Sequence, residues 1–172
     1  VWDLGANDGH FSRLFQGHAD TVVAIDGDEV VVDRLYQELR ETSAVGVLPL
    51  VMNIADPSPG LGWRGRERQR LEDRGTPDLA LMLAVIHHLV VASNIPRVEV
   101  VDWMASLGCE VVFEWVPPDD AMVGALTINK TNREIHADYR EDVFRANIEE
   151  RFDVAQDTPV ANRVLFHLRP RS

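Results

Sequence analysis

The sequence is poor in cysteine and in basic residues, and each shortage excludes a class of protein. Cys109 is the single cysteine in 172 residues, so neither an internal disulfide nor a zinc site built on several thiolates can form. This cysteine usage predicts a reducing compartment and hence a cytoplasmic protein. The 17 lysines and arginines face 28 aspartates and glutamates, which gives a net charge of -11. Such a repulsive field argues against binding to nucleic acid or to an anionic membrane.

The sequence also lacks long apolar runs. None approaches the roughly 20 residues that a membrane-spanning helix requires, and no basic segment leads into an apolar one as in a secretory signal. Its 45% hydrophobic and 26% charged residues are typical of one globular domain, which we place at residues 1–172. Because Val1 and Trp2 already lie inside an apolar run, we expect an N-terminal segment of a longer protein to precede them.

Short apolar runs alternate with amphipathic stretches along the chain. This alternation predicts strand–helix–strand units around a mostly parallel sheet. The apolar runs are nearly continuous, as strands covered on both faces must be. After a first strand at the start of the chain, they predict strands over residues 21–25, 47–52, 79–85 and 110–115, with helices over 29–43, 95–107 and 139–150.

Three segments break this rhythm. Residues 57–77 are interrupted by proline and glycine and predict a loop followed by a solvated, arginine-rich helix over 64–74. Residues 117–132 are expected to be irregular. The last two apolar runs, 152–155 and 163–168, are separated by few residues and predict an antiparallel hairpin.

A glycine-rich turn follows the first predicted strand. Such a turn lets glycine backbone approach a ligand closely and directs free amides at it. The second predicted strand ends at Asp26, which lies 21 residues after Gly5. An acid at this point is well placed to accept hydrogen bonds from both hydroxyls of an adenosine ribose. The spacing therefore predicts a cofactor that contains adenosine.

The glycine pattern distinguishes between cofactors. A dinucleotide site requires Gly-x-Gly-x-x-Gly, whereas this turn begins with Asp3 and has Asn7 at the place of a second glycine. At these residues the sequence resembles the class I S-adenosylmethionine (SAM)-dependent methyltransferases, whose motif acid-x-Gly-x-x-x-Gly is matched by Asp3, Gly5 and Gly9. Asn7 replaces the commoner middle glycine and also tolerates left-handed backbone.

The resemblance extends over essentially the whole chain and implies the fold. We expect an α/β, Rossmann-like, three-layer α/β/α sandwich around a mostly parallel seven-stranded sheet. The family's strand order is 3-2-1-4-5-7-6, with strand 7 antiparallel. The resemblance also implies SAM as the cofactor and S-adenosylhomocysteine (SAH) as its product.

The resemblance further assigns residues to the cofactor. The ribose contact falls on Asp26, and the adenine contact falls on Asn53, with Ile54 beside it and Asp56 as a near alternative. A turn-forming role for Asn53 is an equally good explanation of its position at a strand end. The methionine end of the cofactor is expected beside two further residues, Leu83 and Ala84. Asp28 and Glu29 are expected to begin the helix after the second strand.

Three titratable residues are candidates for a catalytic base. His87 and His88 lie at the exit of the fourth predicted strand, and adjacent histidines cannot face the same way, so we expect at most one of them in the cleft. Glu114 ends the fifth predicted strand in an apolar run, where desolvation can raise a carboxyl pKa. A plain strand-end role is equally consistent with its position. No further ligands stand at metal-binding spacing, so no metal site is expected.

Methyl transfer requires proximity, alignment and a deprotonated acceptor, so few sequence motifs identify the acceptor. The sequence has no Asn-Pro-Pro-Tyr motif for base amino groups and no Pro-Cys nucleophile for cytosine. These absences favour a small metabolite as the acceptor, with a protein as the second choice. The oligomeric state stays open. An inactive SAM-binding interaction module and an NAD-type oxidoreductase are the alternative functions.

Overall fold

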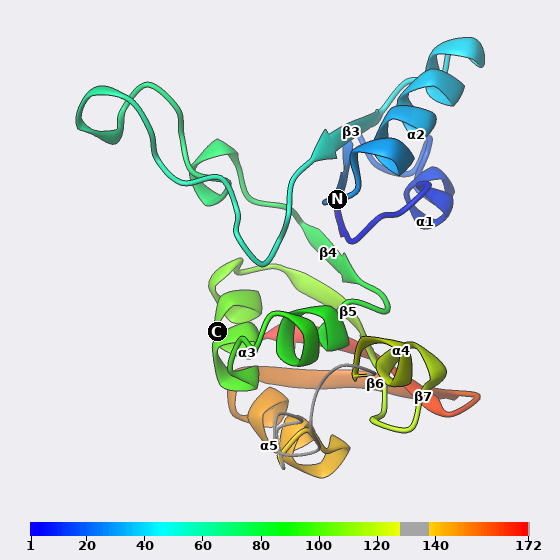
Figure 1. The fold of residues 1–172 in the computed structure, drawn as a ribbon, viewed down its shortest axis with the longest axis vertical. Coiled ribbons are helices and arrows are strands. Elements are labelled where there is room, and N and C mark those ends of the chain that lie inside the picture. Colours follow the sequence, from blue (N-terminus) through cyan, green and yellow to red (C-terminus); the bar gives the residue numbers. More distant parts are fainter. Residues whose placement is uncertain (128–137, 172) are drawn as a thin grey trace. The chain divides into compact units, whose positions relative to one another are not determined.

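The order of the strands in the sheet is β3-β2-β1-β4-β5-β7-β6. The computed structural model describes residues 1–127 and 138–171, and Figure 1 shows its helices and strands. The first four in this order pair in parallel, and β7 pairs antiparallel with both β5 and β6. This confirms the expected α/β class, strand order and terminal hairpin. The strands are β1 (Trp2–Leu4), β2 (Val22–Asp26), β3 (Val47–Val51), β4 (Leu79–Met82), β5 (Glu110–Trp115), β6 (Phe152–Val160) and β7 (Arg163–Pro170).

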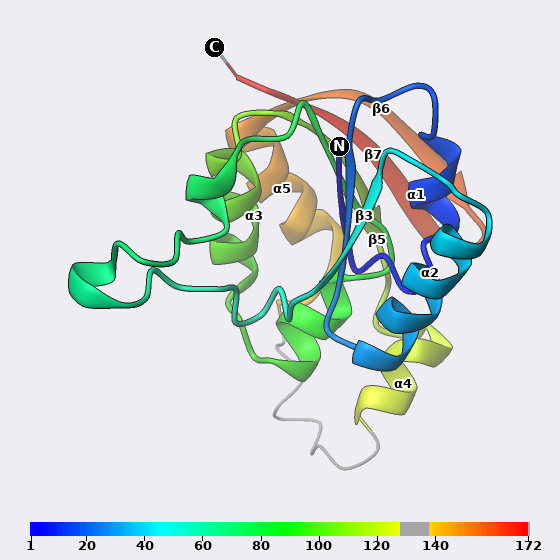
Figure 2. The same cartoon turned by 90° about the horizontal axis from the view of Figure 1, so that it is seen from above.

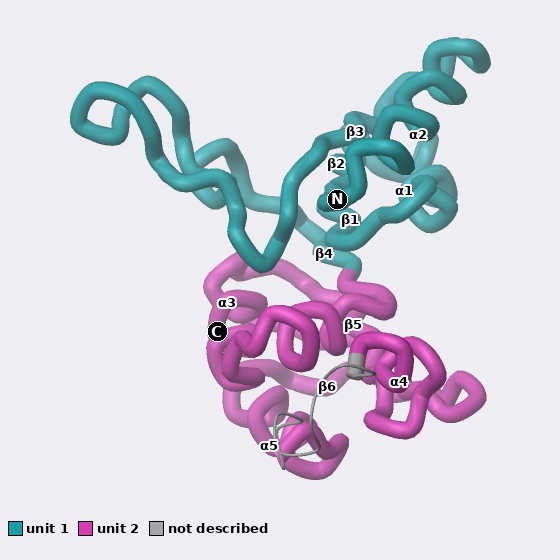
Figure 3. The backbone as a smooth tube through the Cα atoms, in the orientation of Figure 1, with its two compact units in different colours: residues 1–81 teal, residues 82–172 magenta. Residues whose placement is uncertain are grey.

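The chain divides into two compact units, shown in different colours in Figure 3. Unit 1 spans Val1–Leu81 and unit 2 spans Met82–Ser172. Unit 1 holds the glycine-rich turn and the end of β2. Unit 2 holds the histidine pair and Glu114. Each unit is described by itself below.

Unit 1 contains two α-helices, α1 (His10–Leu14) and α2 (Glu29–Glu41). The longer helix, α2, covers the sheet of this unit. The Asp28 carboxylate accepts a hydrogen bond from the Val30 amide, so Asp28 caps α2 as expected. Leucines spaced four residues apart on α2 reach the same face and pack on small residues of the turn and of β2. The members of this cluster are Ala6, Ala24, Leu35 and Leu39.

Strand β3 is less covered than the sequence predicts. It stands at one end of the strand order, and Leu48 and Val51 are 56% and 46% exposed. The expectation that every central strand is covered on both faces is therefore wrong for β3. Pro49 fits this edge position, because proline has no amide proton to donate to a further strand.

The crossover from β3 to β4 contains no arginine-rich helix, so that prediction is wrong. Figure 2 shows a long loop here, with only two short 3-10 turns, Trp63–Gly65 and Glu72–Arg74. Arg64 has left-handed backbone, at φ 59°, between glycines that also have positive φ. Positive φ at Arg64 and Gly65, and the antiparallel bridge that pairs Arg68 with Leu61, are incompatible with a right-handed helix over the first half of this range.

Unit 2 combines the hairpin with three helices, α3 (Arg97–Ser106), α4 (Ala121–Thr127) and α5 (Glu141–Arg151), and with a π-helical turn at His88–Ala92. Helix α4 corrects the expectation of an irregular segment over residues 117–132, of which 128–132 lie outside the described residues. Helix α4 forms because Asp120 caps its N-terminus: the Asp120 carboxylate accepts a hydrogen bond from the Met122 amide.

An aromatic cluster forms the core of unit 2. Phe113 of β5 stacks on Phe144 of α5 with ring centroids 4.9 Å apart, and Trp115 lies 5.3 Å from the same ring. Phe166 of β7 adjoins Phe113, and the Arg145 guanidinium lies 4.7 Å from the Phe166 centroid. Because aromatic contacts add to the burial of their large surfaces, this cluster joins α5 firmly to β5 and β7.

Two glycines of unit 1 provide a matched test of packing at the glycine-rich turn. Gly9 and Gly17 have nearly the same backbone, with φ of 74° and 77°, so alanine strains both. A Cβ at Gly9 would lie 2.7 Å from a methyl carbon of the buried Leu35, whereas at Gly17 it meets nothing within 4 Å. We expect Gly9→Ala to lower the free energy of unfolding by about 1–3 kcal/mol more than Gly17→Ala. Urea denaturation measures the difference, and equal losses would contradict the described packing.

Candidate functional site

The glycine-rich turn of unit 1 is a left-handed stretch bound to β2. Gly5, Asn7 and Gly9 have φ of 78°, 48° and 74°, so each has the conformation that glycine and asparagine tolerate best. The amides of Gly5 and Ala6 both donate to the Ile25 carbonyl, at 2.8 and 2.9 Å. These hydrogen bonds hold the turn beside the end of β2.

Asp26 connects the end of β2 to this turn. Its Oδ2 accepts a hydrogen bond from the Asn7 amide at 2.8 Å, and its Oδ1 accepts one from the Asp28 amide at 2.9 Å. Each carboxylate oxygen can accept more than one hydrogen bond. The two backbone amides therefore fix the carboxylate in place and leave it further capacity to accept hydrogen bonds from hydroxyl groups.

Asp3 lies beneath the turn rather than on its surface. Its side chain is buried, with only 2% of the residue exposed, and its Oδ2 accepts a hydrogen bond from the Ser12 hydroxyl at 2.6 Å. Burial raises the pKa of the Asp3 carboxyl, the hydrogen bonds to Ser12 oppose this shift, and the charge of Asp26 adds to it. The visible role of Asp3 is to join β1 to α1.

Asn53 and its neighbours form a turn just after β3. The Asn53 Oδ1 accepts a hydrogen bond from the Ala55 amide at 3.0 Å, which is the local turn geometry that asparagine favours. Its side chain is exposed, and no hydrogen bond from its amide NH2 group is found among the described residues, while Ile54 is half-buried and Asp56 is exposed. A Cβ on Gly27 would lie 3.5 Å from the Asn53 Cα, so Asn53 lies beside the residue that follows Asp26.

The segment after β4 begins unit 2 with unusual backbone. Leu83 and Ala84 are half-buried, and Ala84 has φ of 53°, a left-handed value that is rare for alanine. Such strain persists where the surrounding structure fixes it, and it is concentrated at functional sites. The sharp turn at Ala84 leads directly into the histidine pair.

The two histidines have different environments. His87 is fully buried and His88 is exposed, with their ring centroids 4.3 Å apart. Within residues 1–127 and 138–171, neither ring nitrogen of His87 has a hydrogen-bond partner. Burial, together with the charges of His88 and Arg163, lowers the pKa of His87 to about 4, and the charge of Asp120 partly opposes this shift. The His87 imidazole is therefore neutral near pH 7.

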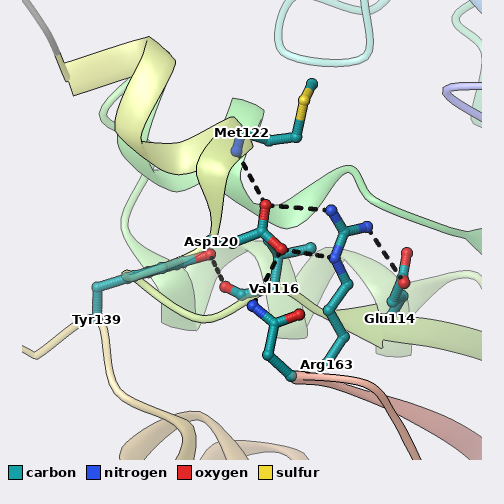
Figure 4. A network of polar contacts seen from close by, with 7 residues as sticks. Glu114, Val116, Asp120, Met122, Tyr139 and Arg163 are labelled. Carbon is teal, nitrogen blue, oxygen red and sulfur yellow. Dashed lines mark hydrogen bonds and ion pairs between the residues drawn. The ribbon is translucent and has the colours of Figure 1, made fainter.

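Glu114 belongs to a cluster of charged side chains at the end of β5, shown in Figure 4. Its Oε1 lies 3.3 Å from Nη1 of Arg163, the first residue of β7. The same guanidinium donates from Nε and Nη2 to both oxygens of Asp120, at 2.8 and 3.2 Å. The hydrogen bonds from Arg163 and from the Met122 amide lower the pKa of Asp120 to about 2. Glu114 is thus paired with a guanidinium rather than with the amides of a loop.

Tyr139 lies beside this cluster on the approach to α5. Its hydroxyl donates to the Val116 carbonyl at 2.7 Å, and burial raises the pKa of Tyr139. No sequence pattern identified Tyr139, Asp120 or Arg163 as neighbours of the site. Arg163 begins the predicted hairpin and Asp120 follows two prolines, but 43 residues separate Asp120 from Arg163. Their contact depends on the register between β5 and β7.

Residues 1–127 and 138–171 contain neither a metal-binding cluster nor a membrane-spanning helix. No group of three or more histidine, cysteine, aspartate or glutamate side chains there is arranged to hold a metal ion. No helix in the same residues has both the length and the apolar character needed to cross a membrane. Cys109 is buried.

Comparison with known proteins identifies one curated relative and many similar folds. No model of a known protein family matches the chain. The nodulation protein NoeA of Rhizobium meliloti is 32% identical over 169 residues, which are 96% of this chain and 35% of NoeA. The chain therefore spans about a third of the length of that relative.

Two solved structures represent the similar folds. The N-methyltransferase NodS from Bradyrhizobium japonicum superposes with a TM-score of 0.63 and 16% identity, over 99% of this chain and 85% of NodS. The magnesium protoporphyrin IX methyltransferase ChlM from Synechocystis, solved with bound SAM, gives a TM-score of 0.60 and 19% identity, over 98% of this chain and 69% of ChlM. Together with the strand order, these likenesses show that the chain has the Rossmann-like fold of the class I SAM-dependent methyltransferases.

The buried neutral imidazole predicts a pH dependence of stability. Because His87 titrates near 4 in the folded protein but near 6.5 when unfolded, the unfolded state binds more protons between these values. The free energy of unfolding should therefore fall as the pH drops through this window, by on the order of 1 kcal/mol per pH unit from His87 alone.

Denaturant unfolding between about pH 5 and about pH 7 measures this contribution. In His87→Gln the decline should be shallower than in the wild type. The exposed His18 provides the control, because His18→Gln removes an imidazole without changing a buried site. The same pH dependence in His87→Gln and in the wild type would contradict the burial of a neutral His87.

Proposed function

We propose that this protein is a SAM-dependent methyltransferase that transfers a methyl group to a small-molecule acceptor. The observation that carries the proposal is the Asp26 carboxylate, which the Asn7 and Asp28 amides hold at the end of β2 beside the glycine-rich turn. A fixed carboxylate at this point of a Rossmann-like sheet suits the two hydroxyls of a ribose. The methyltransferases with this fold support the choice of SAM over a dinucleotide.

The cofactor-binding residues of unit 1 have complementary roles in this proposal. Asp26 binds the ribose, and Asn53 offers its free amide group to the adenine. Gly5, Asn7 and Gly9 let the backbone of the turn approach the cofactor closely. Asp3 has an indirect role, because its hydrogen bond with Ser12 holds α1 next to the turn.

In unit 2, the proposed methionine contacts are Leu83 and Ala84, which precede the catalytic candidates. SAM supplies a methyl group on a positively charged sulfur, so the protein has to align the acceptor and, where needed, accept a proton. A pKa of about 4 makes His87 a weak base and a permanently neutral hydrogen-bonding group near pH 7. His88 and Glu114 are the other candidates for proton transfer, and His88 is the more exposed of the two histidines.

The proposed cellular location and acceptor class follow from the composition of the chain. A lone, buried Cys109 suits the reducing cytoplasm. The net charge of -11 disfavours nucleic acid as the acceptor, which leaves small molecules first and proteins second. Incubation with SAM and fractionated small metabolites tests the activity, with SAH formation as the readout. SAH formation that no metabolite fraction raises above the protein-free background would count against a small-molecule acceptor.

Replacing the ribose-binding carboxylate tests the cofactor assignment. Asp26→Asn keeps the size of the side chain but removes the charge that strengthens its hydrogen bonds to hydroxyls, and it leaves one oxygen instead of two to accept the Asn7 and Asp28 amides. We expect it to weaken SAH binding by about 10- to 100-fold in isothermal titration calorimetry.

Asp28→Asn is the matched control, because asparagine also caps a helix N-terminus and α2 should remain intact. It should bind SAH nearly as the wild type does. If the two variants bind SAH equally well, Asp26 does not contact the ribose.

A further inference from the structure

The charged cluster of unit 2 has one guanidinium for two carboxylates. Arg163 makes two hydrogen bonds to Asp120 and a single, longer contact to Glu114, at 3.3 Å. Asp120 also accepts hydrogen bonds from the Met122 amide and the Asn162 side chain. Arg163 is therefore committed mainly to Asp120, and the charge of Glu114 is only partly neutralised.

Glu114 keeps one oxygen for another partner. Its Oε1 contacts Arg163, and no hydrogen bond or ion pair to its Oε2 is found in the part of the chain that the structure describes. The Glu114 side chain is 16% exposed, so this carboxylate is largely desolvated yet reachable from outside. A partly buried carboxylate with an unused oxygen attracts a positively charged hydrogen-bond donor more strongly than an exposed one does.

His87 is a second polar side chain of unit 2 with unused hydrogen-bonding capacity. It is fully buried, and both of its ring nitrogens lack a partner among the described residues. The charges of Arg163 and Asp120 both influence the pKa of its imidazole. A neutral imidazole adds hydrogen-bonding capacity but no positive charge, so these four side chains carry a net charge of about -1.

We propose that Glu114, assisted by His87, binds a positively charged amino or guanidino group of the methyl acceptor. This inference rests on the proposed methyltransferase function and narrows its substrate class. A carboxylate stabilises the protonated form of a bound amine, and a protonated nitrogen has no lone pair with which to attack a methyl group. The bound cation is therefore the group by which the acceptor is recognised, and another atom of the acceptor receives the methyl group.

Three small probes of similar length test the charge preference. Putrescine carries two ammonium groups, butanediol carries none, and succinate carries two carboxylates. With SAH present, titrations followed by NMR should give putrescine the lowest dissociation constant and succinate the highest. Equal affinities, or tighter binding of succinate, would overturn the proposal.

Two variants of β5 locate the binding carboxylate. Glu114→Gln should raise the dissociation constant of putrescine about tenfold or more, because the charge that holds the ammonium is lost. Glu110→Gln is the matched control, since Glu110 lies on the same strand but its carboxylate contacts His167 and Arg169. It should leave putrescine binding unchanged. Equal effects of the two variants would show nonspecific attraction and overturn the proposal.

A measurement on the wild-type protein covers the case in which Glu114→Gln does not fold. Putrescine should shift the ring resonances of His87, which are identified by their loss in His87→Gln, and should leave those of His167 in place. Unchanged His87 resonances at saturating putrescine would overturn the proposal. SAH titration without any probe reports on cofactor binding alone, so a failed amine site and a failed methyltransferase assignment give different results.

Discussion

The Asp26 carboxylate is the constraint on which the glycine-rich turn of unit 1 depends. Its two oxygens accept the amides of Asn7 and Asp28, so one side chain fixes both the glycine-rich turn after β1 and the start of α2. The turn could not hold its shape alone, because three of its residues have left-handed backbone and left-handed segments do not support one another as helical turns do. The carbonyl of Ile25 and the carboxylate of Asp26 supply the missing support from β2.

Unit 2 uses the same principle with a different pair of groups. Arg163 at the start of β7 holds Asp120, and Asp120 in turn caps α4 through the Met122 amide. One guanidinium thus joins the hairpin to the segment after β5. The cluster also contributes to the electrostatic environment of His87, whose pKa is kept low mainly by burial and further by the positive charges of His88 and Arg163.

Much of the fold could be predicted because it depends on local patterns. Apolar runs located the strands, the spacing of Asp26 after Gly5 located the end of β2, and Asp28 was recognisable as a helix cap. The features that could not be predicted depend on distant pairing or on backbone conformation. The contact of Asp120 with Arg163 follows from strand register, and the positive φ of Arg64 at the start of the expected helix is not encoded by residue type. Likewise, sequence indicated that His87 and His88 differ, but only packing decides that His87 is the buried one.

This division between predictable and unpredictable features has a chemical cause. A ribose and a sulfonium are the same in every SAM-dependent reaction, so their recognition can be reduced to a short turn and one acid at a fixed spacing. The acceptor side has no such fixed chemistry, since methyl transfer requires mainly alignment. In the proposed function, alignment depends on residues far apart in sequence, such as His87, Glu114 and Arg163, whose roles are inferred from their burial and from how their charges are compensated. For this fold, the sequence therefore predicts the cofactor, whereas the acceptor has to be inferred from the balance of charge among side chains in three dimensions.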